Sequence, residues 1–324
     1  MKRNIYLKTI PPAEAVARVK ASIDREALIR EETIPSHEAS GRVLAHAVHA
    51  RYSSPTFHSA AMDGYAVNAR STFAAREGHP LTLKAGETCF AVNTGHPMPE
   101  GCDAVIMIEQ VMLDGGSVTI EAPAFPWQHV RRIGEDIVAT ELLFPRNHQL
   151  RPWDVGALLS GGIWDVPVWE RVTVRIIPTG DEVLDFTTHP DPGKGQVVES
   201  NSQMLAALAR ELGCVVERAA PVPDNPEALH QALKDSLDAG RHLTIFCAGS
   251  SAGSKDFTRA TLEKEGEILT HGIAAMPGKP SLLANCRGRL VAGAPGYPVS
   301  ALVCFKELLE PLISWLSHRE PPAK

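Results

Sequence analysis

The stretch RVTVRIIPTGDEV (171–183) decides the fold class of this chain. Its run VTVRII (172–177) is rich in β-branched residues, which favour a β-strand, and the polar turn PTGDE follows it directly. Downstream, strand-like runs alternate repeatedly with helical runs. Such βα repeats predict an α/β architecture, in which a doubly wound, mostly parallel sheet carries helices on both faces.

Hydrophobic spacing places the other elements of this part. In NSQMLAALARELG (201–213), leucines recur on one helical face, with Asn201 as the N-cap and Gly213 as the stop. Further strands are expected over 215–222, 242–247 and 289–294, and further helices from Pro226, from near Asp256, and from Val299 to about Leu316.

The part before residue 171 has a different character. Its segments are short and punctuated by Pro and Gly, which indicates mostly β structure with turns. One helix opens it at Pro11 and Pro12, with Val16 and Val19 on one face. We therefore expect a mixed, mainly β region with a linking helical segment before the α/β domain. The expected divisions are a linking domain (1–47 and 138–170), a mainly β domain (48–137), an α/β domain (171–318) and a tail (319–324).

Composition excludes several classes of protein. With 44% hydrophobic and 22% charged residues among 324, the chain can bury a core and is neither disordered nor fibrous. No run approaches the roughly 18–20 apolar residues of a membrane span, and MKRNIYLKTIPP (1–12) lacks the apolar region of a signal peptide. The net charge of −6 argues against nucleic acid as a partner, because that affinity rests on phosphate neutralisation by basic residues.

The six cysteines point to a reducing compartment. They form no C-x-x-C pair, which argues against a zinc or iron–sulfur site. Most lie in apolar or Gly-flanked runs, where a buried free thiol is the ordinary interpretation. Together with the missing signal peptide, they predict a cytoplasmic protein.

Polar loops follow three of the predicted strands. They carry Glu182 after 172–177, Asp224 after 215–222, and Asp256 in AGSSAGSKD (248–256) after 242–247. Because the carboxyl ends of parallel strands meet at one edge of a sheet, we expect one carboxylate-bearing rim there. Each aspartate taken alone could be a helix N-cap instead.

The loop 248–256 has the composition of an anion-binding turn. Small residues let backbone N–H groups approach a phosphate, and the helix that follows adds its positive N-terminus. A generic Gly/Ser turn is the alternative. Nearby, MPGKP (276–280) places Lys279 in a tight bend, where it is either an anion ligand or a solvated surface lysine.

Three segments of the first half also hold polar residues among small and apolar ones. Asp63 precedes Gly64, which suits a carboxylate held on a turn or a plain Asp-Gly turn. Thr94 lies in VNTGHP, and Asp136 ends the GED of RRIGEDI (131–137). The residues alone indicate an α/β enzyme or binding protein with a rim for an anion and a metal.

Eight segments in order resemble the molybdopterin molybdenumtransferase family, which includes the E domain of gephyrin. They are PTFHSAAMDGYAV, VNTGHPMPEGCDAVIMIE, RRIGEDI, IIPTGDEV, ESNSQMLAAL, AGSSAGSKDF, PGKP and APGYPVSA. They run from about residue 35 to 318, whereas the family's small C-terminal β domain has no counterpart in this sequence. One such motif would be weak, but eight in order are specific.

The resemblance implies an activity and its participants. The reaction would be insertion of molybdate into adenylylated molybdopterin with release of AMP, with Mg²⁺ as cofactor. The protein would be a homodimer with its active site in a cleft between subunits, supplied by an upstream molybdopterin adenylyltransferase.

The resemblance also assigns residues to roles. The catalytic residues would be Asp63, Thr94, Asp136, Glu182, Asp224 and Asp256. The cofactor-binding residues would be Thr179, Gly180, Gly249, Ser250, Ser251, Gly253 and Lys279. The Mg²⁺ ligands would be Glu182, Asp224 and Asp256.

Several positions depart from the family pattern. Ala248 replaces a glycine of the phosphate loop, Thr140 replaces a glycine after GED, and Tyr297 replaces the asparagine of PGNP. Met276 stands where the family has a basic residue. The alternatives are therefore a non-catalytic molybdopterin-binding or carrier protein and an unrelated nucleotide hydrolase; the retained carboxylates favour the enzyme, because carboxylates repel an anionic ligand unless a metal is present.

Overall fold

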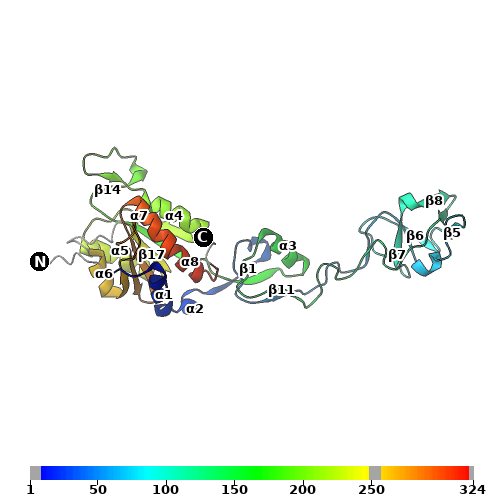
Figure 1. Ribbon diagram of the computed structural model, residues 1–324, viewed down its shortest axis with the longest axis horizontal. Helices are drawn as coiled ribbons and strands as arrows, with labels where there is room; N and C mark the ends of the chain where they lie inside the picture. The colour runs from blue at the N-terminus through cyan, green and yellow to red at the C-terminus, as the bar shows by residue number, and fades with distance from the viewer. Residues whose placement is uncertain (1–8, 248–256, 321–324) are drawn as a thin grey trace. The chain divides into compact units, whose positions relative to one another are not determined.

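The computed structural model describes residues 9–247 and 257–320. The chain divides into two compact units (Figure 1). The α/β unit comprises Met1–Thr33, Gly41–Ala45 and Pro167–Lys324, and the second unit comprises Ile34–Ser40 and His46–Val166. Across 9–247 and 257–320, every helix is too short or too polar to span a bilayer.

The α/β unit is built on a six-stranded sheet with the order β16-β13-β17-β20-β19-β18. Four neighbouring strands are parallel, namely β16 (Val215–Arg218), β13 (Thr173–Pro178), β17 (Leu243–Cys247) and β20 (Arg289–Ala294). The fifth strand, β19 (Leu282–Cys286), lies between β20 and the edge strand β18 (Gly266–His271) and pairs antiparallel with both. The mostly parallel sheet is therefore confirmed, although strands β18 and β19 and their antiparallel pairing had not been predicted.

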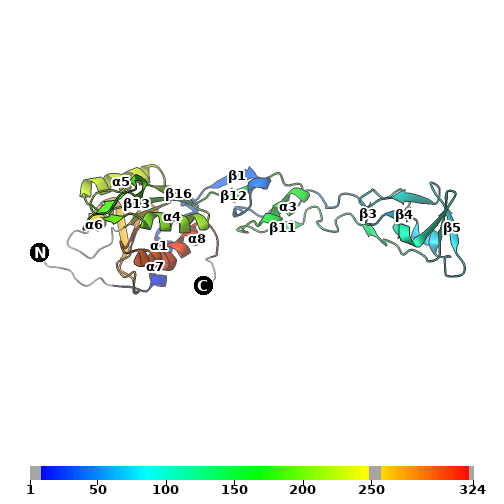
Figure 2. The ribbon, with the colours of Figure 1, turned by 90° about the horizontal axis from the view of Figure 1, so that it is seen from above.

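Helices cover both faces of this sheet (Figure 2). In β13, Ile176 joins the core under α1, α4, α7 and α8, whereas its neighbour Ile177 joins the core under α5 and α6. This alternation is the period of two that places successive strand residues on opposite faces. The helices are α1 (Pro12–Ser22), α4 (Asn201–Glu211), α5 (Pro226–Asp238), α6 (Phe257–Glu265), α7 (Pro298–Cys304) and α8 (Glu310–Leu316). The doubly wound arrangement is confirmed.

The helix predicted from Val299 to about Leu316 is interrupted. A π-helical turn, Phe305–Leu309, separates α7 from α8. Pro311 in the first turn of α8 has no N–H to donate to a preceding carbonyl, which accounts for the local change of pitch. At α4 the residue before the helix is Ser200, so the prediction of Asn201 as the N-cap is wrong, and the Asn201 side chain bonds elsewhere.

The N-terminal helix packs with the α/β unit. Val16 and Val19 of α1 are buried in its larger core, and Ile10 forms a bridge to Ile273. At the other end, Arg319 donates to the carbonyl oxygens of Leu212 and Gly41. The N-terminal helix and Arg319 thus belong to the α/β unit, although the helix is far from that unit in sequence.

The second unit consists mostly of short strands. One three-stranded sheet has the order β6-β4-β7 and another β5-β9-β8, and β3/β10 and β2/β11 form two-stranded ladders. Their bounds are β2 (Val48–His49), β3 (Ser59–Ala60), β4 (Gly64–Val67), β5 (Leu81–Lys84), β6 (Cys89–Val92), β7 (Ala104–Met107), β8 (Val111–Asp114), β9 (Ser117–Ile120), β10 (Val130–Arg131) and β11 (Leu142–Phe144), with helix α3 (Pro152–Ser160). The mainly β character of this part is confirmed.

A few short elements remain. They are α2 (Arg25–Leu28), the paired strands β1 (Glu31–Pro35) and β12 (Asp165–Trp169), the paired strands β14 (Val183–Leu184) and β15 (Val197–Val198), and single 3₁₀ turns at Ser36–Glu38, Ala69–Thr72, Ile108–Gln110 and Phe186–Thr188. The β14–β15 pair departs from the end of β13 and returns at the start of α4.

Candidate functional site

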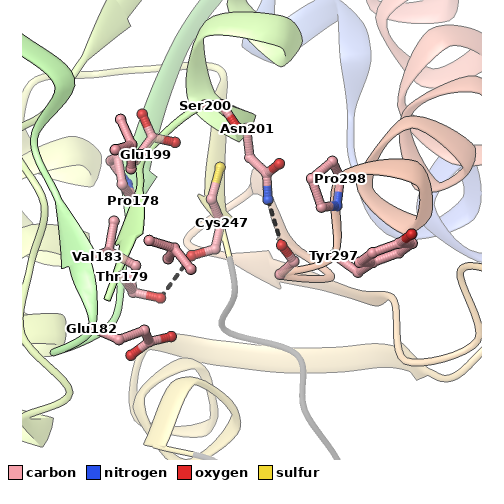
Figure 3. Close-up of a pocket in the computed structure, with 13 residues that line it drawn as sticks. Pro178, Thr179, Glu182, Val183, Glu199, Ser200, Asn201, Cys247, Tyr297 and Pro298 are labelled. Atoms are coloured by element: carbon pink, nitrogen blue, oxygen red, sulfur yellow. Dashed lines mark hydrogen bonds between the residues drawn. The ribbon is translucent and has the colours of Figure 1, made fainter. Parts of the chain in front are cut away.

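A cavity of about 410 Å³ lies at the carboxyl ends of β13 and β17 (Figure 3). The carboxyl edge of a parallel sheet is where ligands bind in open α/β folds. The wall of the cavity is formed by residues from the ends of β13 and β17, from β14 and β15, and from the starts of α4 and α7. They are Pro178, Thr179, Glu182, Val183, Val197, Val198, Glu199, Ser200, Asn201, Cys247, Gly296, Tyr297 and Pro298.

Thr179 and Cys247 join the two central strands beneath this cavity. The Thr179 backbone N–H and hydroxyl both donate to the Cys247 carbonyl oxygen, at 3.0 and 2.7 Å. Burial, followed by the nearby charge of Glu199, raises the pKa of the Cys247 thiol. The thiol therefore stays protonated and supplies no thiolate nucleophile.

The turn after Thr179 requires a glycine. Gly180 has φ +134°, and a Cβ there would lie 2.9 Å from Glu182 Oε2 and from Val183 Cγ2. The Gly180 N–H donates to the Val222 carbonyl at 3.1 Å, which fixes the turn against the loop after β16. Glu182 is thereby presented, exposed, at the cavity wall.

The two helix starts supply the polar part of the wall. Asn201 Nδ2 donates to the Gly296 carbonyl at 2.8 Å, which ties the start of α4 to the turn before α7. Among the residues that the structure describes, Asn201 Oδ1 has no hydrogen-bond partner. Tyr297 keeps 66% of its surface exposed, so an aromatic ring stands beside the cavity.

Of the residues that the resemblance singled out, several gather at this rim. Thr179 and Glu182 line the cavity, and Gly180 lies between them. Asp224 is exposed on the neighbouring loop, where its N–H donates to Asp181 Oδ1 at 3.0 Å. Lys279 is exposed on a turn that packs on α7, since a Cβ at Gly278 would lie 3.0 Å from Val303.

Part of the predicted site falls outside the described residues, namely Gly249, Ser250, Ser251, Gly253 and Asp256. Their segment continues directly from Cys247 in the cavity wall. Within 9–247 and 257–320, no group of three His, Cys, Asp or Glu side chains is placed to hold a metal ion. Met276, at the position of the family's basic residue, is 90% exposed.

The second unit brings together two of its three predicted residues. Asp63 Oδ1 accepts hydrogen bonds from the Thr94 backbone N–H and hydroxyl. Asp136 is exposed after β10, and its N–H donates to the Ser54 carbonyl at 3.0 Å. The neighbouring Glu135 pairs with Arg131 at 2.7 Å, so the two carboxylates of the GED motif have different surroundings.

Some residues of the cavity wall were not predicted. Glu199, Ser200 and Asn201 belong to the segment ESNSQ, and Tyr297 belongs to PGYP. The available signal was the cluster of polar residues immediately before a helical pattern, which was interpreted as a helix start and as part of the family resemblance but was given no role in the site. The valines of β14 and β15 gave no signal, because a two-residue strand has no periodicity to detect.

Comparisons with known proteins cover nearly the whole chain. Residues 10–162 match a family model described as the MoeA N-terminal region (domain I and II), and residues 175–315 match the probable molybdopterin binding domain. Molybdopterin molybdenumtransferase of Haemophilus influenzae is 34% identical over 309 residues, which are 89% of this chain and 74% of that protein. Molybdopterin molybdenumtransferase 2 of Mycobacterium tuberculosis is 34% identical over 308 residues, or 87% and 74%.

A solved structure of a related protein has the same fold over nearly the whole chain. The molybdopterin biosynthesis MoeA protein from Pyrococcus horikosii superimposes with a TM-score of 0.81 at 29% identity, over 97% of this chain and 81% of that one. The cavity lies within the part of this chain that matches the molybdopterin binding domain.

Proposed function

Because this chain belongs to the molybdopterin molybdenumtransferase family, we propose that its cavity binds adenylylated molybdopterin and that the enzyme inserts molybdate into this ligand with release of AMP. The protein is a transferase of molybdenum cofactor biosynthesis. One observation carries the assignment of the site: the cavity opens at the carboxyl edge of the parallel strands, within the matched molybdopterin-binding region. Family membership favours this function over a carrier or a nucleotide hydrolase.

The residues around the cavity suit a ligand that is both aromatic and anionic. Val183, Val197 and Tyr297 offer apolar and aromatic surface for a ring system. Thr179 and Gly180 form the turn at the cavity wall, and because their N–H groups already donate to the Cys247 and Val222 carbonyl oxygens, the backbone donors for phosphate are proposed to come from the glycine-rich segment 248–256. In this proposal Lys279 supplies a positive charge from the turn packed on α7, and Gly249, Ser250, Ser251 and Gly253 hold the phosphate.

Magnesium is the proposed cofactor, with Glu182, Asp224 and Asp256 as its ligands. The hydrogen bond between Asp224 N–H and Asp181 ties the loop of Asp224 to the turn of Glu182, so two exposed carboxylates lie on adjoining loops. This is a donor set of hard oxygen atoms, which Mg²⁺ prefers, and phosphate oxygens would complete it. When bound, the ion would supply neutralisation of the phosphoanhydride charge.

We propose further that Asp63, Thr94 and Asp136 serve catalysis and that the enzyme is a homodimer. An upstream molybdopterin adenylyltransferase is proposed to supply the substrate. All six cysteines are free thiols, which suits a reducing cytoplasm.

The proposal is tested by incubating the purified chain with adenylylated molybdopterin, molybdate and Mg²⁺. AMP release and appearance of molybdenum-loaded cofactor are both measured, and Glu182→Gln is run beside wild type. Stoichiometric AMP and loaded cofactor, both lost in Glu182→Gln, are expected. Ligand binding without AMP release would instead identify a carrier.

A further inference from the structure

A buried carboxylate forms part of the cavity wall, in the segment that joins β15 to α4. Glu199 is only 5% exposed, and it lines the cavity between Val198 and Ser200. Its Oε1 accepts the Ser202 backbone N–H at 2.7 Å, and its Oε2 accepts the Ser202 hydroxyl at 2.5 Å. A buried charge is retained only where it is paired and hydrogen-bonded.

Arg218 supplies the opposite charge from the carboxyl end of β16. Its side chain is 14% exposed, and Nη2 lies 3.4 Å from Glu199 Oε2. Its Nε donates to the Ser202 hydroxyl at 2.9 Å. The guanidinium thus contacts both members of the Glu199–Ser202 pair, which places it against the first turn of α4.

The same guanidinium holds a second segment. Its Nη2 donates to Asp185 Oδ1 at 3.1 Å, and its Cζ lies 4.6 Å from the ring centroid of Phe186. Both residues follow β14 directly. Hydrogen bonds from the Thr187 N–H and hydroxyl, together with Arg218, hold the pKa of Asp185 below its ordinary value, so this carboxylate remains charged.

The excursion from β14 to β15 begins and ends in a short parallel ladder that pairs Val183 with Val197 and Leu184 with Val198. In this ladder the Val197 N–H donates to the Glu182 carbonyl at 3.0 Å, and the Glu199 N–H donates to the Leu184 carbonyl at 2.9 Å. This excursion supplies Val183, Val197 and Val198 to the cavity wall. In addition to this backbone ladder, the Arg218 side chain bridges the outgoing end of the excursion, at Asp185, and its returning end, at Glu199.

We propose that Arg218 is a positioning residue for ligand binding, and that it fixes the β14–β15 excursion and Glu199 so that the cavity is formed before the ligand arrives. The inference rests on the proposed function of this cavity. Without Arg218 the wall would be correctly placed only part of the time. The apparent affinity for the ligand would fall in proportion to the fraction of molecules whose wall is correctly placed, whereas the enzyme with ligand bound would react at the same rate.

Proteolysis within the excursion measures how often this segment opens, independently of catalytic activity. Lys194 is exposed at the tip of the excursion, so a lysine-specific protease can cut there without affecting arginine bonds. Cleavage of a locally opened segment follows the population of the open state. In Arg218→Met we expect cleavage after Lys194 to accelerate at least about fivefold, and KM for adenylylated molybdopterin to rise about tenfold with kcat changed less than about twofold.

Arg241→Met is the matched control. Arg241 pairs with Glu217 at 2.7 Å, so this variant removes an ion pair from the neighbouring residue of the same strand. Cleavage after Lys194 and KM should both match wild type in this variant. Arg218→Lys keeps the charge but loses the planar fork, and it should fall between wild type and Arg218→Met.

If Arg218→Met does not fold, Asp185→Asn tests the same bridge. It keeps the side-chain oxygen that accepts the Thr187 N–H while removing the charge that Arg218 contacts. Unchanged cleavage and unchanged KM in folded variants would overturn the inference while leaving the proposed function intact. Conversely, a wild-type chain that does not bind adenylylated molybdopterin would overturn the proposed function, and the cleavage rates would still test the bridge.

Discussion

The backbone N–H of Thr94 donates a 2.7 Å hydrogen bond to Asp63 Oδ1, and the Thr94 hydroxyl donates to the same oxygen at 3.1 Å. The backbone beside Asp63 is closely packed against β7. A Cβ at Gly64 would lie only 2.0 Å from the Ile106 carbonyl oxygen, so only glycine fits there. The carboxylate thus has one fixed orientation on an otherwise exposed surface. Two residues that the family resemblance assigned separately to catalysis form one unit.

Thr94→Val should lower kcat about tenfold, because it removes one of two donors that orient Asp63. The unfolding free energy should change by less than about 1 kcal/mol, since the pair is exposed. Thr82→Val is the control, because it likewise removes an exposed threonine hydroxyl, which lies 3.3 Å from the Thr119 hydroxyl. Equal kcat values for the two variants would contradict the coupling. Steady-state kinetics and urea unfolding provide both measurements.

The stability of the α/β unit should fall as the pH drops below about 6.5. Burial lowers the pKa of His242, against the opposing effect of Glu170, and its Nδ1 accepts the Thr173 N–H at 3.0 Å, which also disfavours protonation there. The folded pKa therefore lies below the unfolded value of about 6.5, so the unfolded chain binds the proton first and acid favours unfolding.

The measurement is urea unfolding at pH 5, 6 and 7. His242→Gln should flatten the decline with falling pH, whereas His37→Gln, at an exposed position, should leave it unchanged. A wild-type stability that rises from pH 7 to 5 would reverse the expected sign.

Mg²⁺ should bind tightly only with the anionic ligand present, because exposed carboxylates on adjoining loops form an incomplete set of hard ligands by themselves. Calorimetric titration of Mg²⁺ is compared with and without AMP and molybdate. We expect affinity at least about tenfold higher in their presence, and loss of that difference in Asp224→Asn. Equal affinities in both titrations would argue against a shared site.

An inactive Asp63→Ala chain mixed with an inactive Asp256→Ala chain should regain partial activity if the enzyme is the proposed homodimer. One of the two sites in such a heterodimer would then carry both intact carboxylates. Activity is compared with each variant alone, and heterodimers are verified by native mass spectrometry. No recovery in verified heterodimers would mean that each site is built within one subunit.

Thiol labelling should distinguish Cys102 from the other five cysteines. Cys102 is half-buried, whereas the others are buried, and burial raises the pKa of Cys214 and Cys286 to about 12 and that of Cys304 to about 11. With iodoacetamide at pH 8, mass spectrometry should find Cys102 modified at least about tenfold faster. All six should react alike in urea. Rapid native labelling of Cys304 would contradict the buried core under α7.

Local sequence determined the elements of the α/β unit. The β-branched run 172–177 became β13, and the helices from Pro226 and Pro12 formed where their apolar spacing predicted. Strand and helix periods are short-range properties, so a single sequence reveals them. The edge strand β18 was not predicted, because it follows α6 without a turn and no local pattern marks that change.

Only the tertiary structure decided which polar residues meet. Asn201 bonds Gly296 across 95 residues, and Arg218 reaches back to Glu199 and Asp185. These contacts arise because parallel strands deliver distant loops to one edge, and no local spacing encodes which loops become neighbours. The sequence thus predicted candidate carboxylates and glycine-rich turns, whereas the fold created the cavity wall and the arginine bridge behind it.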